Sequence, residues 1–279
     1  MLELVDVCKH YGSTESDGGT VQALQDVSLS VKEGEFVSII GSSGCGKSTL
    51  LEIVAGLVPA STGELRIHGE RVDGPNPRVG MVFQEESTFP WLTAQANVEF
   101  GLRAAGVSRV AATKQAREML HLVGLHGFEN HYPDQLSGGM RQRVAIARAL
   151  VTRPEVILMD EPFGALDEQT RIVLGEELLR LWQGTGSTVL FVTHSLSEAA
   201  MLADRIAVLS SRPGRIIELI EVTLPRPRSS EIIGTPAFTA ITGQLWKHLQ
   251  REARRSAGLE DVRAQQQTAE ADSLTLGAS

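Results

Sequence analysis

The sequence predicts an α/β fold, in which short buried strands alternate with helices around a largely parallel sheet. Five apolar runs of strand length show little polar–apolar alternation, which is typical of strands buried on both faces. These runs are residues 36–40, 79–83, 156–159, 189–193 and 206–209. Helical patterns at residues 50–57, which stop before Pro59, and at 169–182 lie between some of the strands. Strands that alternate with helices indicate an α/β core.

A stretch of helices without strands is predicted in the middle of the chain. Its three helices are expected at residues 97–105, 110–123 and 140–150. Glycine and proline residues separate them, as is usual between short helices. We therefore expect a helical subdomain at about 91–151, inserted into an α/β core formed by about 1–90 and 152–224.

The periodic pattern weakens beyond about residue 225. One amphipathic helix is expected at about 238–254, within a C-terminal helical extension at 225–256. Residues 257–279 contain no aromatic residue and no periodicity, which predicts a disordered tail. Arginines form local basic clusters in this region, at positions Arg226, Arg228, Arg251, Arg254 and Arg255. A solvated face is the ordinary interpretation of such clusters, and contact with anionic lipid headgroups is the alternative.

Composition and charge exclude several classes of protein. The 279 residues carry 26 Lys and Arg against 34 Asp and Glu, a net charge of −8, which disfavours a nucleic acid as partner. Cys8 and Cys45 lie far apart and form no Cys-x-x-Cys pair, so neither a disulfide framework nor a zinc cluster is expected. The chain begins without a secretory signal and has no apolar run of 18–20 residues. We therefore expect a cytoplasmic protein that meets a membrane only through a partner.

Residues 41–49 form a phosphate-binding motif. They read GSSGCGKST, which satisfies G-x-x-x-x-G-K-[ST] between an expected strand and an expected helix. Glycines let the backbone wind close to phosphates, amide N–H groups at the helix N-terminus point at the anion, and a lysine adds a point charge. The expected phosphate contacts are Gly41, Ser42, Gly44, Cys45, Gly46, Lys47, Ser48 and Thr49. A glycine-rich turn before an ordinary helix is the alternative, which the strand–loop–helix context disfavours.

Two adjacent carboxylates follow the predicted strand at 156–159. A nucleoside triphosphatase needs a carboxylate for the metal and a group that positions the attacking water. Asp160 is expected at the strand end as the metal ligand, and Glu161 one residue further out as the group that acts on water. A solvated loop start is the alternative reading of an Asp-Glu pair, and the phosphate motif makes it less attractive. The adjacent glutamate favours a hydrolase over a small-molecule kinase.

Four further stretches give the sequence a resemblance to the ATP-binding subunits of ABC transporters. LSGGMRQRVAIARAL at 136–150 resembles the signature motif of that family, and DEPFGALD at 160–167 resembles its Walker B motif and D-loop. Gln84 in VFQEES is similar to the Q-loop glutamine, and His194 in FVTHSLSEA to the switch histidine. The resemblance covers roughly residues 2–220. It implies an ABC ATPase domain at 1–224 with a RecA-like P-loop NTPase core, the inserted helical subdomain and a small N-terminal β subdomain.

The signature segment begins with Ser137, Gly138 and Gly139 at the start of a predicted helix. Free N–H groups and the positive end of the helix dipole make this helix start an anion site. The resemblance implies a homodimer, in which the signature of one subunit closes over the γ-phosphate held by the other subunit. A simple N-cap at Ser137 is the structural reading of the same residues. The chain has Met140 where the generic motif has glutamine.

The resemblance also assigns roles around the nucleotide, with ATP and Mg²⁺ as the cofactors. It implies that Glu161, His194 and Gln84 are catalytic, and that Ser48, Gln84 and Asp160 hold the metal. Tyr11 resembles the aromatic residue that stacks on adenine, and a surface tyrosine is the alternative. Base–aromatic stacking contributes about 1–3 kcal/mol in other systems.

Cargo and partners are expectations from resemblance alone. The residues after Gln84 include an apolar cluster of Phe89, Trp91 and Leu92, which either packs inward or meets a partner. Segments such as PWLTAQANVEFGL and SRPGRI resemble the nitrate/sulfonate/taurine group of bacterial importers. That group implies a separate permease, a periplasmic substrate-binding protein and a peripheral location on the cytoplasmic face of the inner membrane. The alternatives are another cargo or an exporter; repair ATPases with coiled-coil insertions and two-cassette translation factors do not fit this chain.

Overall fold

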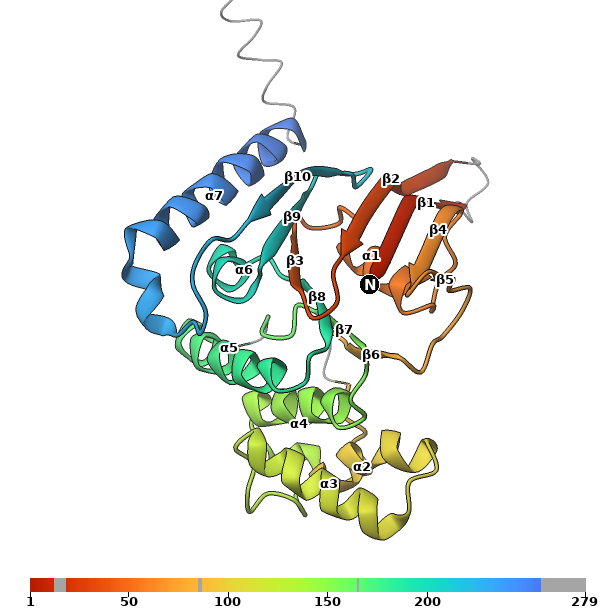
Figure 1. The fold of residues 1–279 in the computed structure, drawn as a ribbon, viewed down its shortest axis with the longest axis vertical. Helices are drawn as coiled ribbons and strands as arrows, with labels where there is room; N and C mark the ends of the chain where they lie inside the picture. The colour runs from red at the N-terminus through yellow and green to blue at the C-terminus, as the bar shows by residue number, and fades with distance from the viewer. Residues whose placement is uncertain (13–18, 85–86, 165, 257–279) are drawn as a thin grey trace, which may run out of the picture.

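The computed structural model describes residues 1–12, 19–84, 87–164 and 166–256, and the tail expected at 257–279 lies outside them (Figure 1). The core is a six-stranded sheet of order β10-β9-β3-β8-β7-β6. Its strands are β3 (Phe36–Ile40), β6 (Val79–Val82), β7 (Val156–Asp160), β8 (Thr188–Val192), β9 (Arg205–Leu209) and β10 (Ile216–Glu221). The five strands expected from apolar runs are confirmed and run parallel, and β10 adds an antiparallel edge.

The order of the parallel strands determines where chemistry can gather. Every residue of β3, β7 and β8 is buried, in agreement with their apolar composition. β8 lies between β3 and β7 and pairs with both. The carboxyl ends of parallel strands share one edge of the sheet, and ligands bind there in open α/β folds. The loops that follow β3, β7 and β8 therefore lie side by side.

A second, antiparallel sheet forms the small N-terminal β subdomain that the resemblance implied. Its strands, in the order β2-β1-β4-β5, are β1 (Leu2–Gly12), β2 (Thr20–Val31), β4 (Thr62–Ile67) and β5 (Glu70–Arg71). Irregular pairing interrupts the β1–β2 ladder, and Asp6 and Asp26 have left-handed φ angles of 48°. These irregularities break the alternation that would have revealed the strands in the sequence. Helix α1 (Lys47–Val54) shares a core with both sheets through Leu50 and Leu51.

Three helices cover the other face of the large sheet (Figure 1). They are α5 (Glu168–Gln183), α6 (Leu196–Leu202) and α7 (Pro236–Ser256). Phe36 lies at the centre of this core, where its ring centroid is 5.3 Å from that of Trp182 and 5.7 Å from that of Phe191. The short helix α6 was not foreseen, because seven residues hold too few turns for a periodic signal. Among the described residues, no helix is long and apolar enough to span a bilayer.

The helical subdomain lies at the end of the molecule opposite β10 and the C-terminal end of α7 (Figure 1). It contains α2 (Ala94–Ala104), α3 (Arg109–Leu122), a 3₁₀ turn (Pro133–Gln135) and α4 (Gly138–Leu150). A hydroxyl at Thr93, Ser108 and Ser137 caps the start of each α-helix. The three helices begin one to three residues before the expected positions, because polar caps precede the apolar pattern. The subdomain has a hydrophobic core of its own.

Two of the C-terminal arginines do not lie on a solvated face. The Arg228 guanidinium is buried and donates hydrogen bonds to the main-chain carbonyls of Met201, Ala203, Val222 and Leu224. Arg226 binds Asp204 at 2.7 Å and lies 4.6 Å above the Trp182 ring. A solvated face and a lipid contact are therefore both wrong for Arg226 and Arg228. Their side chains instead attach the C-terminal extension to the segments around α6 and β10. Residues 251, 254 and 255 are exposed on α7.

We expect Arg228→Ala to lower the free energy of unfolding by about 2–4 kcal/mol, because several buried carbonyls lose their donor. Burial lowers the pKa of Arg228 to about 10, which leaves the side chain cationic near neutral pH. Urea denaturation followed by circular dichroism measures the change. Arg254→Ala, on the exposed face of α7, is the matched control and should stay within about 0.5 kcal/mol of wild type. Equal effects of the two substitutions would contradict a structural role for the Arg228 contacts.

Candidate active site

A pocket of about 760 Å³ lies at the carboxyl ends of β3, β7 and β8. Its walls come from both sheets and from the loops between them. The lining residues are Tyr11, Val21, Ala23, Ser43, Gly44, Gly46, Lys47, Ser48, Thr49, Gln84, Glu161, His194 and Arg212. Most of the side chains predicted from separate motifs are therefore gathered around one cavity. Gly41, Ser42 and Cys45 belong to the same loop but are not among the residues that line the pocket.

The phosphate-binding loop has the backbone that its glycines allow. Gly44 and Gly46 have φ angles of 73° and 104°, and Gly46 is the residue before the first turn of α1. A Cβ atom at Gly46 would lie 2.7 Å from a Leu24 methyl, so the position has no room for a side chain. The buried Lys47 ammonium donates to the carbonyls of Gly41 and Ser42, each at 3.0 Å. The lysine thus spans the loop beneath the first N–H groups of α1, the geometry of an anion site.

Asp160 supplies a buried carboxylate below the loop. Ser48 hydrogen-bonds to it, and its Oδ1 atom has no hydrogen-bond partner within the described part of the chain. Burial raises the pKa of Asp160, while the Ser48 hydrogen bond and the Lys47 charge act in the opposite direction. Mg²⁺ prefers a hard oxygen set of one or two carboxylates with phosphate oxygens and water. The free carboxylate oxygen and the adjacent hydroxyl fit that preference, whereas the described residues contain no cluster of three acidic, His or Cys side chains.

Glu161 is the point at which three strand ends meet. His194 Nδ1 lies 3.0 Å from Glu161 Oε2, and Gln84 Nε2 donates to the same oxygen at 3.4 Å. The Glu161 N–H group donates to the carbonyl of Val192 at 2.9 Å, which extends the β7–β8 ladder by one residue. Glu161 also has a left-handed φ of 43°, an unfavourable backbone for a residue with a Cβ atom. The catalytic set expected from three motifs is thus in direct contact.

Tyr11 lies near the end of β1, where it pairs with Val21 of β2, and both residues line the pocket. Its side chain is 39% exposed, and the Lys9 ammonium lies 4.9 Å from the ring centroid. The Lys9 Nζ atom also donates to the carbonyl of Pro59 at 2.8 Å, which fixes the lysine against the loop after α1. The ring is accessible from the cavity and is held by a cation. Both stacking on a base and a purely structural role stay compatible with this arrangement.

The signature residues do not join this pocket within one chain. None of the residues that line it belongs to α4. The Ser137 hydroxyl accepts from the N–H group of Met140 at 3.3 Å, so Ser137 is an N-cap. The first turn of α4 contains no acidic residue, and Gly138 and Gly139 are partly accessible. The helix start is therefore partly accessible and lies outside the pocket that contains the chain's own phosphate loop.

Comparisons with known proteins place the chain in a family. The sequence profile of the family described as "ABC transporter" matches residues 24–164. The chain belongs to the ABC transporter ATP-binding family. The taurine import ATP-binding protein TauB of Escherichia coli strain K12 is 44% identical, over 85% of this chain and 96% of TauB. An uncharacterised ABC transporter ATP-binding protein of Methanocaldococcus jannaschii is 50% identical, over 77% of this chain and 80% of that protein.

Solved structures agree with this assignment. The dimeric, post-hydrolysis structure of an ATP-binding cassette bound to ADP and Pi superposes with a TM-score of 0.72. It is 37% identical, and the match covers 81% of this chain and all of that one. The expected fold, a P-loop NTPase core with an inserted helical subdomain, is confirmed. As a member of this family, the chain is an ATPase.

Sequence reasoning missed four residues that line this pocket, of which Ser43 lies within the phosphate-binding motif itself. Val21 and Ala23 come from β2, whose irregular pairing hid the strand in the sequence. Arg212 comes from the loop between β9 and β10, and its Nε atom donates to the carbonyl of Gly44 at 3.1 Å. Only the SRPGRI segment marked that loop in the sequence, and it indicated the importer group instead of a contact with the phosphate loop.

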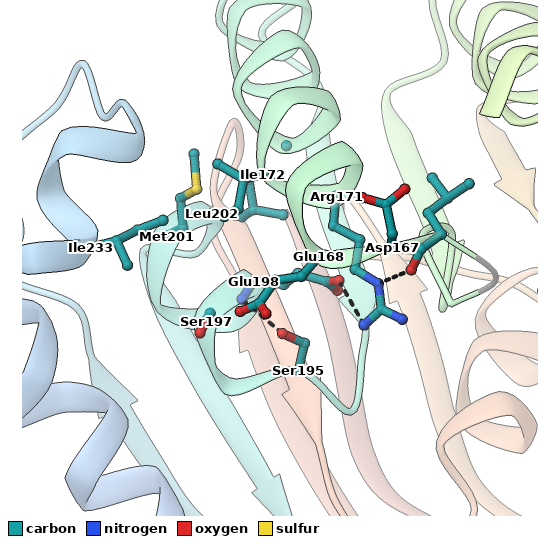
Figure 2. Close-up of a pocket in the computed structure, with 12 residues that line it drawn as sticks. Asp167, Glu168, Arg171, Ile172, Ser195, Ser197, Glu198, Met201, Leu202 and Ile233 are labelled. Carbon is teal, nitrogen blue, oxygen red and sulfur yellow. Dashed lines mark hydrogen bonds and ion pairs between the residues drawn. The ribbon is translucent and has the colours of Figure 1, made fainter.

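A second pocket, of about 300 Å³, lies between the start of α5 and α6 (Figure 2). Arg171 donates to the carbonyl of Leu166 at 2.7 Å and to that of Gly164 at 3.1 Å. Its guanidinium also lies 3.9 Å from Glu198, which accepts a 2.5 Å hydrogen bond from the Thr193 hydroxyl. Figure 2 shows Arg171 and Glu198 among the side chains of this pocket. The network joins the segment after Asp160 and Glu161 to Thr193, the residue that precedes His194.

Glu198→Gln should change the pH dependence of stability. Burial raises the pKa of the Glu198 carboxyl above its ordinary 4.5, and the Thr193 hydrogen bond and the Arg171 charge only partly oppose this. The folded protein thus holds this proton more tightly than the unfolded chain, and ionisation costs stability as the pH rises from about 4.5 through the raised pKa. The advantage of the variant over wild type should grow there by at most about 1.4 kcal/mol per pH unit. Urea denaturation from pH 4.5 to 8 measures this, and a difference independent of pH would contradict it.

Proposed function

We propose that this chain is the ATP-hydrolysing subunit of a bacterial ABC importer. In this proposal, two copies bind two Mg-ATP between them and drive a separate membrane-spanning permease that takes up a small anion such as nitrate, a sulfonate or taurine. The observation that carries the hydrolytic part is the convergence of Gln84 and His194 on Glu161 beside the phosphate loop. Three strand ends contribute one group each, in the positions that the family motifs predict.

The chemistry follows from the groups around the pocket. Lys47 and the N–H groups of the loop receive the phosphate chain, and Lys47 exchanges its loop carbonyls for phosphate oxygens. Ser48, Asp160 and Gln84 are the residues that would hold Mg²⁺, which neutralises charge on the phosphates. Glu161 polarises the attacking water as a general base.

Neighbouring side chains orient the reacting groups. Gln84 and His194 restrain the Glu161 carboxylate, and His194 contacts the γ-phosphate. Tyr11, which lines the same pocket, stacks on adenine. Each of these groups comes from a different strand or loop, so the pocket is organised by the sheets before nucleotide binds.

The start of α4 supports a shared nucleotide site. It contributes no residue to the chain's own pocket, so we infer that an anion bound at its N–H groups comes from another molecule. The solved cassette with a TM-score of 0.72 is itself dimeric. We infer that Ser137, Gly138 and Gly139 of one copy close over the γ-phosphate held by Lys47 of the other.

An exposed aromatic cluster is the proposed permease surface. The Phe89 ring lies 5.5 Å from Trp91 and 4.8 Å from Phe100, measured between centroids. Trp91 is 69% exposed and Phe100 is 51% exposed, although Phe89 is half-buried. Arg148 of α4 lies 4.9 Å from the Phe89 ring centroid and donates to the Ser87 carbonyl at 2.7 Å. The cluster thus joins the segment after Gln84 to α2 and α4, and large exposed aromatic patches mark interaction sites.

The importer class and the cargo rest on relatives. TauB is named as a taurine import protein and matches this chain over 96% of its length. This supports import over export, a peripheral location on the cytoplasmic face of the inner membrane, and a periplasmic substrate-binding protein in the same system. Another cargo or an exporter is the alternative.

We expect Glu161→Gln to lower the rate of ATP hydrolysis by about 10²–10⁴-fold, because the amide cannot accept a proton from water. Nucleotide binding should persist, since the phosphate loop is unchanged, and the slow variant should accumulate as an ATP-bound dimer. Phosphate release and size-exclusion chromatography with Mg-ATP measure the two effects.

Adding Ser137→Arg to Glu161→Gln provides the control for the shared site. The large cationic side chain of arginine should block the contact between the start of α4 and the γ-phosphate held by the other copy. The double variant should therefore bind ATP and stay monomeric. A near-normal hydrolysis rate for Glu161→Gln would contradict the catalytic assignment. A dimer that survives Ser137→Arg would contradict the shared site.

Deletion of the gene in its own organism should abolish uptake of labelled taurine, an alkanesulfonate or nitrate. Wild type and Trp246→Ala, which changes an exposed tryptophan on α7, should restore uptake. Trp91→Ala should fail to restore it while the purified variant keeps its basal ATPase rate, because the permease contact is lost. Unchanged uptake of all three compounds after deletion would rule out this cargo class, and full complementation by Trp91→Ala would rule out the proposed surface.

A further inference from the structure

The loop between β9 and β10, residues 210–215, lies directly on the phosphate-binding loop. Arg212 donates from Nε to the Gly44 carbonyl at 3.1 Å, and its side chain lines the nucleotide pocket. A Cβ atom on Gly214 would lie only 2.1 Å from the carbonyl oxygen of Cys45. The two loops therefore touch along their backbones, and any displacement of one is transmitted to the other.

One side of this loop is attached to the wall of the pocket. The Gly214 N–H group donates to the Ala23 carbonyl at 2.9 Å, and the Gln25 N–H group donates to the Gly214 carbonyl at 3.0 Å. Arg215 also donates to the Gln25 side chain at 3.1 Å. Ala23 itself lines the pocket. The loop thus contacts β2, the strand that pairs with β1 at Tyr11.

The other side of the loop is attached to the last turns of α7. Glu252 is only 2% exposed. Its carboxylate accepts from the Ser211 N–H group at 2.8 Å and from the Ser211 hydroxyl at 3.2 Å. Arg255 lies 3.1 Å away as its ion-pair partner. Figure 1 shows this end of α7 beside β10. Burial of a carboxylate is unfavourable unless it is hydrogen-bonded, so Glu252 is a specific anchor and not part of a solvated helix face.

The cation at Arg212 is directed at a pocket that is suited to an anion. The Arg212 Nε atom donates to the Gly44 carbonyl. The Nη2 atom also lies close to Gly44, since a Cβ atom at that position would be 3.3 Å from it. The charge of Arg212 also acts on the inside of the loop. Burial raises the pKa of the Cys45 thiol, and the charges of Lys47 and Arg212 act to lower it. A guanidinium has five donors, and one bond to Gly44 leaves others for phosphate oxygens.

We propose that Arg212 is a nucleotide-binding residue that donates to the phosphate chain, and that Glu252 positions it through Ser211. This inference rests on the proposed role of the pocket as the ATP site. The C-terminal extension then sets the affinity for nucleotide without touching it. Arg212 stabilises bound ADP and ATP alike, whereas Glu161 acts on hydrolysis and His194 contacts the γ-phosphate that ADP lacks.

The test measures dissociation constants for ADP and for ATP with Mg²⁺ by isothermal titration calorimetry on the full chain. Arg212→Ala and Glu252→Ala should each weaken binding about ten-fold, which corresponds to about 1.4 kcal/mol. The rate at saturating ATP should stay within about two-fold, so that the change appears in KM. Arg254→Ala on the exposed face of the same helix is the control and should bind as wild type does.

A double-mutant cycle separates positioning from general destabilisation. If Glu252 acts through Arg212, Glu252→Ala should have no further effect on ADP affinity in the Arg212→Ala background. Arg212→Lys, which keeps the charge and loses the fork geometry, should fall between wild type and Arg212→Ala. Because Arg212 is exposed, Arg212→Lys tests the binding role even where Glu252→Ala does not fold.

Wild-type affinity in Arg212→Ala would overturn the binding role. Additive effects of the two alanine substitutions would overturn the positioning role of Glu252. Lys47→Ala distinguishes failure of the proposed ATP site, because unchanged ADP binding in that variant would place the nucleotide elsewhere. Loss of binding in Lys47→Ala together with normal binding in Arg212→Ala would leave the ATP site intact and reject this inference alone.

Discussion

The pairing of β8 with both β3 and β7 is the constraint on which the rest of the structure depends. Backbone hydrogen bonds hold adjacent strands about 4.8 Å apart, and the parallel direction brings their carboxyl ends to one edge. The phosphate loop, the two carboxylates and His194 follow these three strands. Residues that are more than 100 positions apart in the chain, such as Ser48 and Asp160, are therefore brought together by the strands that precede them. Burial of both faces stabilises this sheet, so apolar packing determines the geometry of a polar site.

Parts of the structure with a local signal could be predicted from the sequence. The apolar runs gave the five parallel strands, and the spacing of Gly41, Gly46 and Lys47 located the phosphate loop. Strand β1 escaped detection because irregular pairing interrupts its alternation. Arg228 and Arg212 were misjudged or missed because their partners are backbone carbonyls, which carry no residue-specific signal. A contact between side chain and distant main chain depends on tertiary structure alone.

The distribution of charge has more meaning than its sum. A net charge of −8 gives no indication of an anion site, since the phosphate loop uses N–H groups, a helix terminus and Lys47. Most of the buried charged groups are compensated individually. Arg228 is surrounded by carbonyls, and Glu252 accepts from a backbone N–H group. Asp160 and Arg226 each keep one buried side-chain atom without a hydrogen-bond partner among the described residues, and the Asp160 oxygen lies directly below the phosphate loop.

The left-handed backbone at Glu161 restricts how this protein can vary over evolutionary time. Glycine, asparagine and aspartate tolerate that conformation best, and only aspartate among them retains a carboxylate. Aspartate is one methylene shorter, so its oxygen would withdraw from His194 and Gln84, which both contact Oε2 of the present side chain. Residues that would relax the backbone thus remove the chemistry, and β-branched residues would increase the strain. Selection on shape and selection on reactivity therefore favour different residues at this position, and glutamate is retained for its reactivity despite the unfavourable backbone.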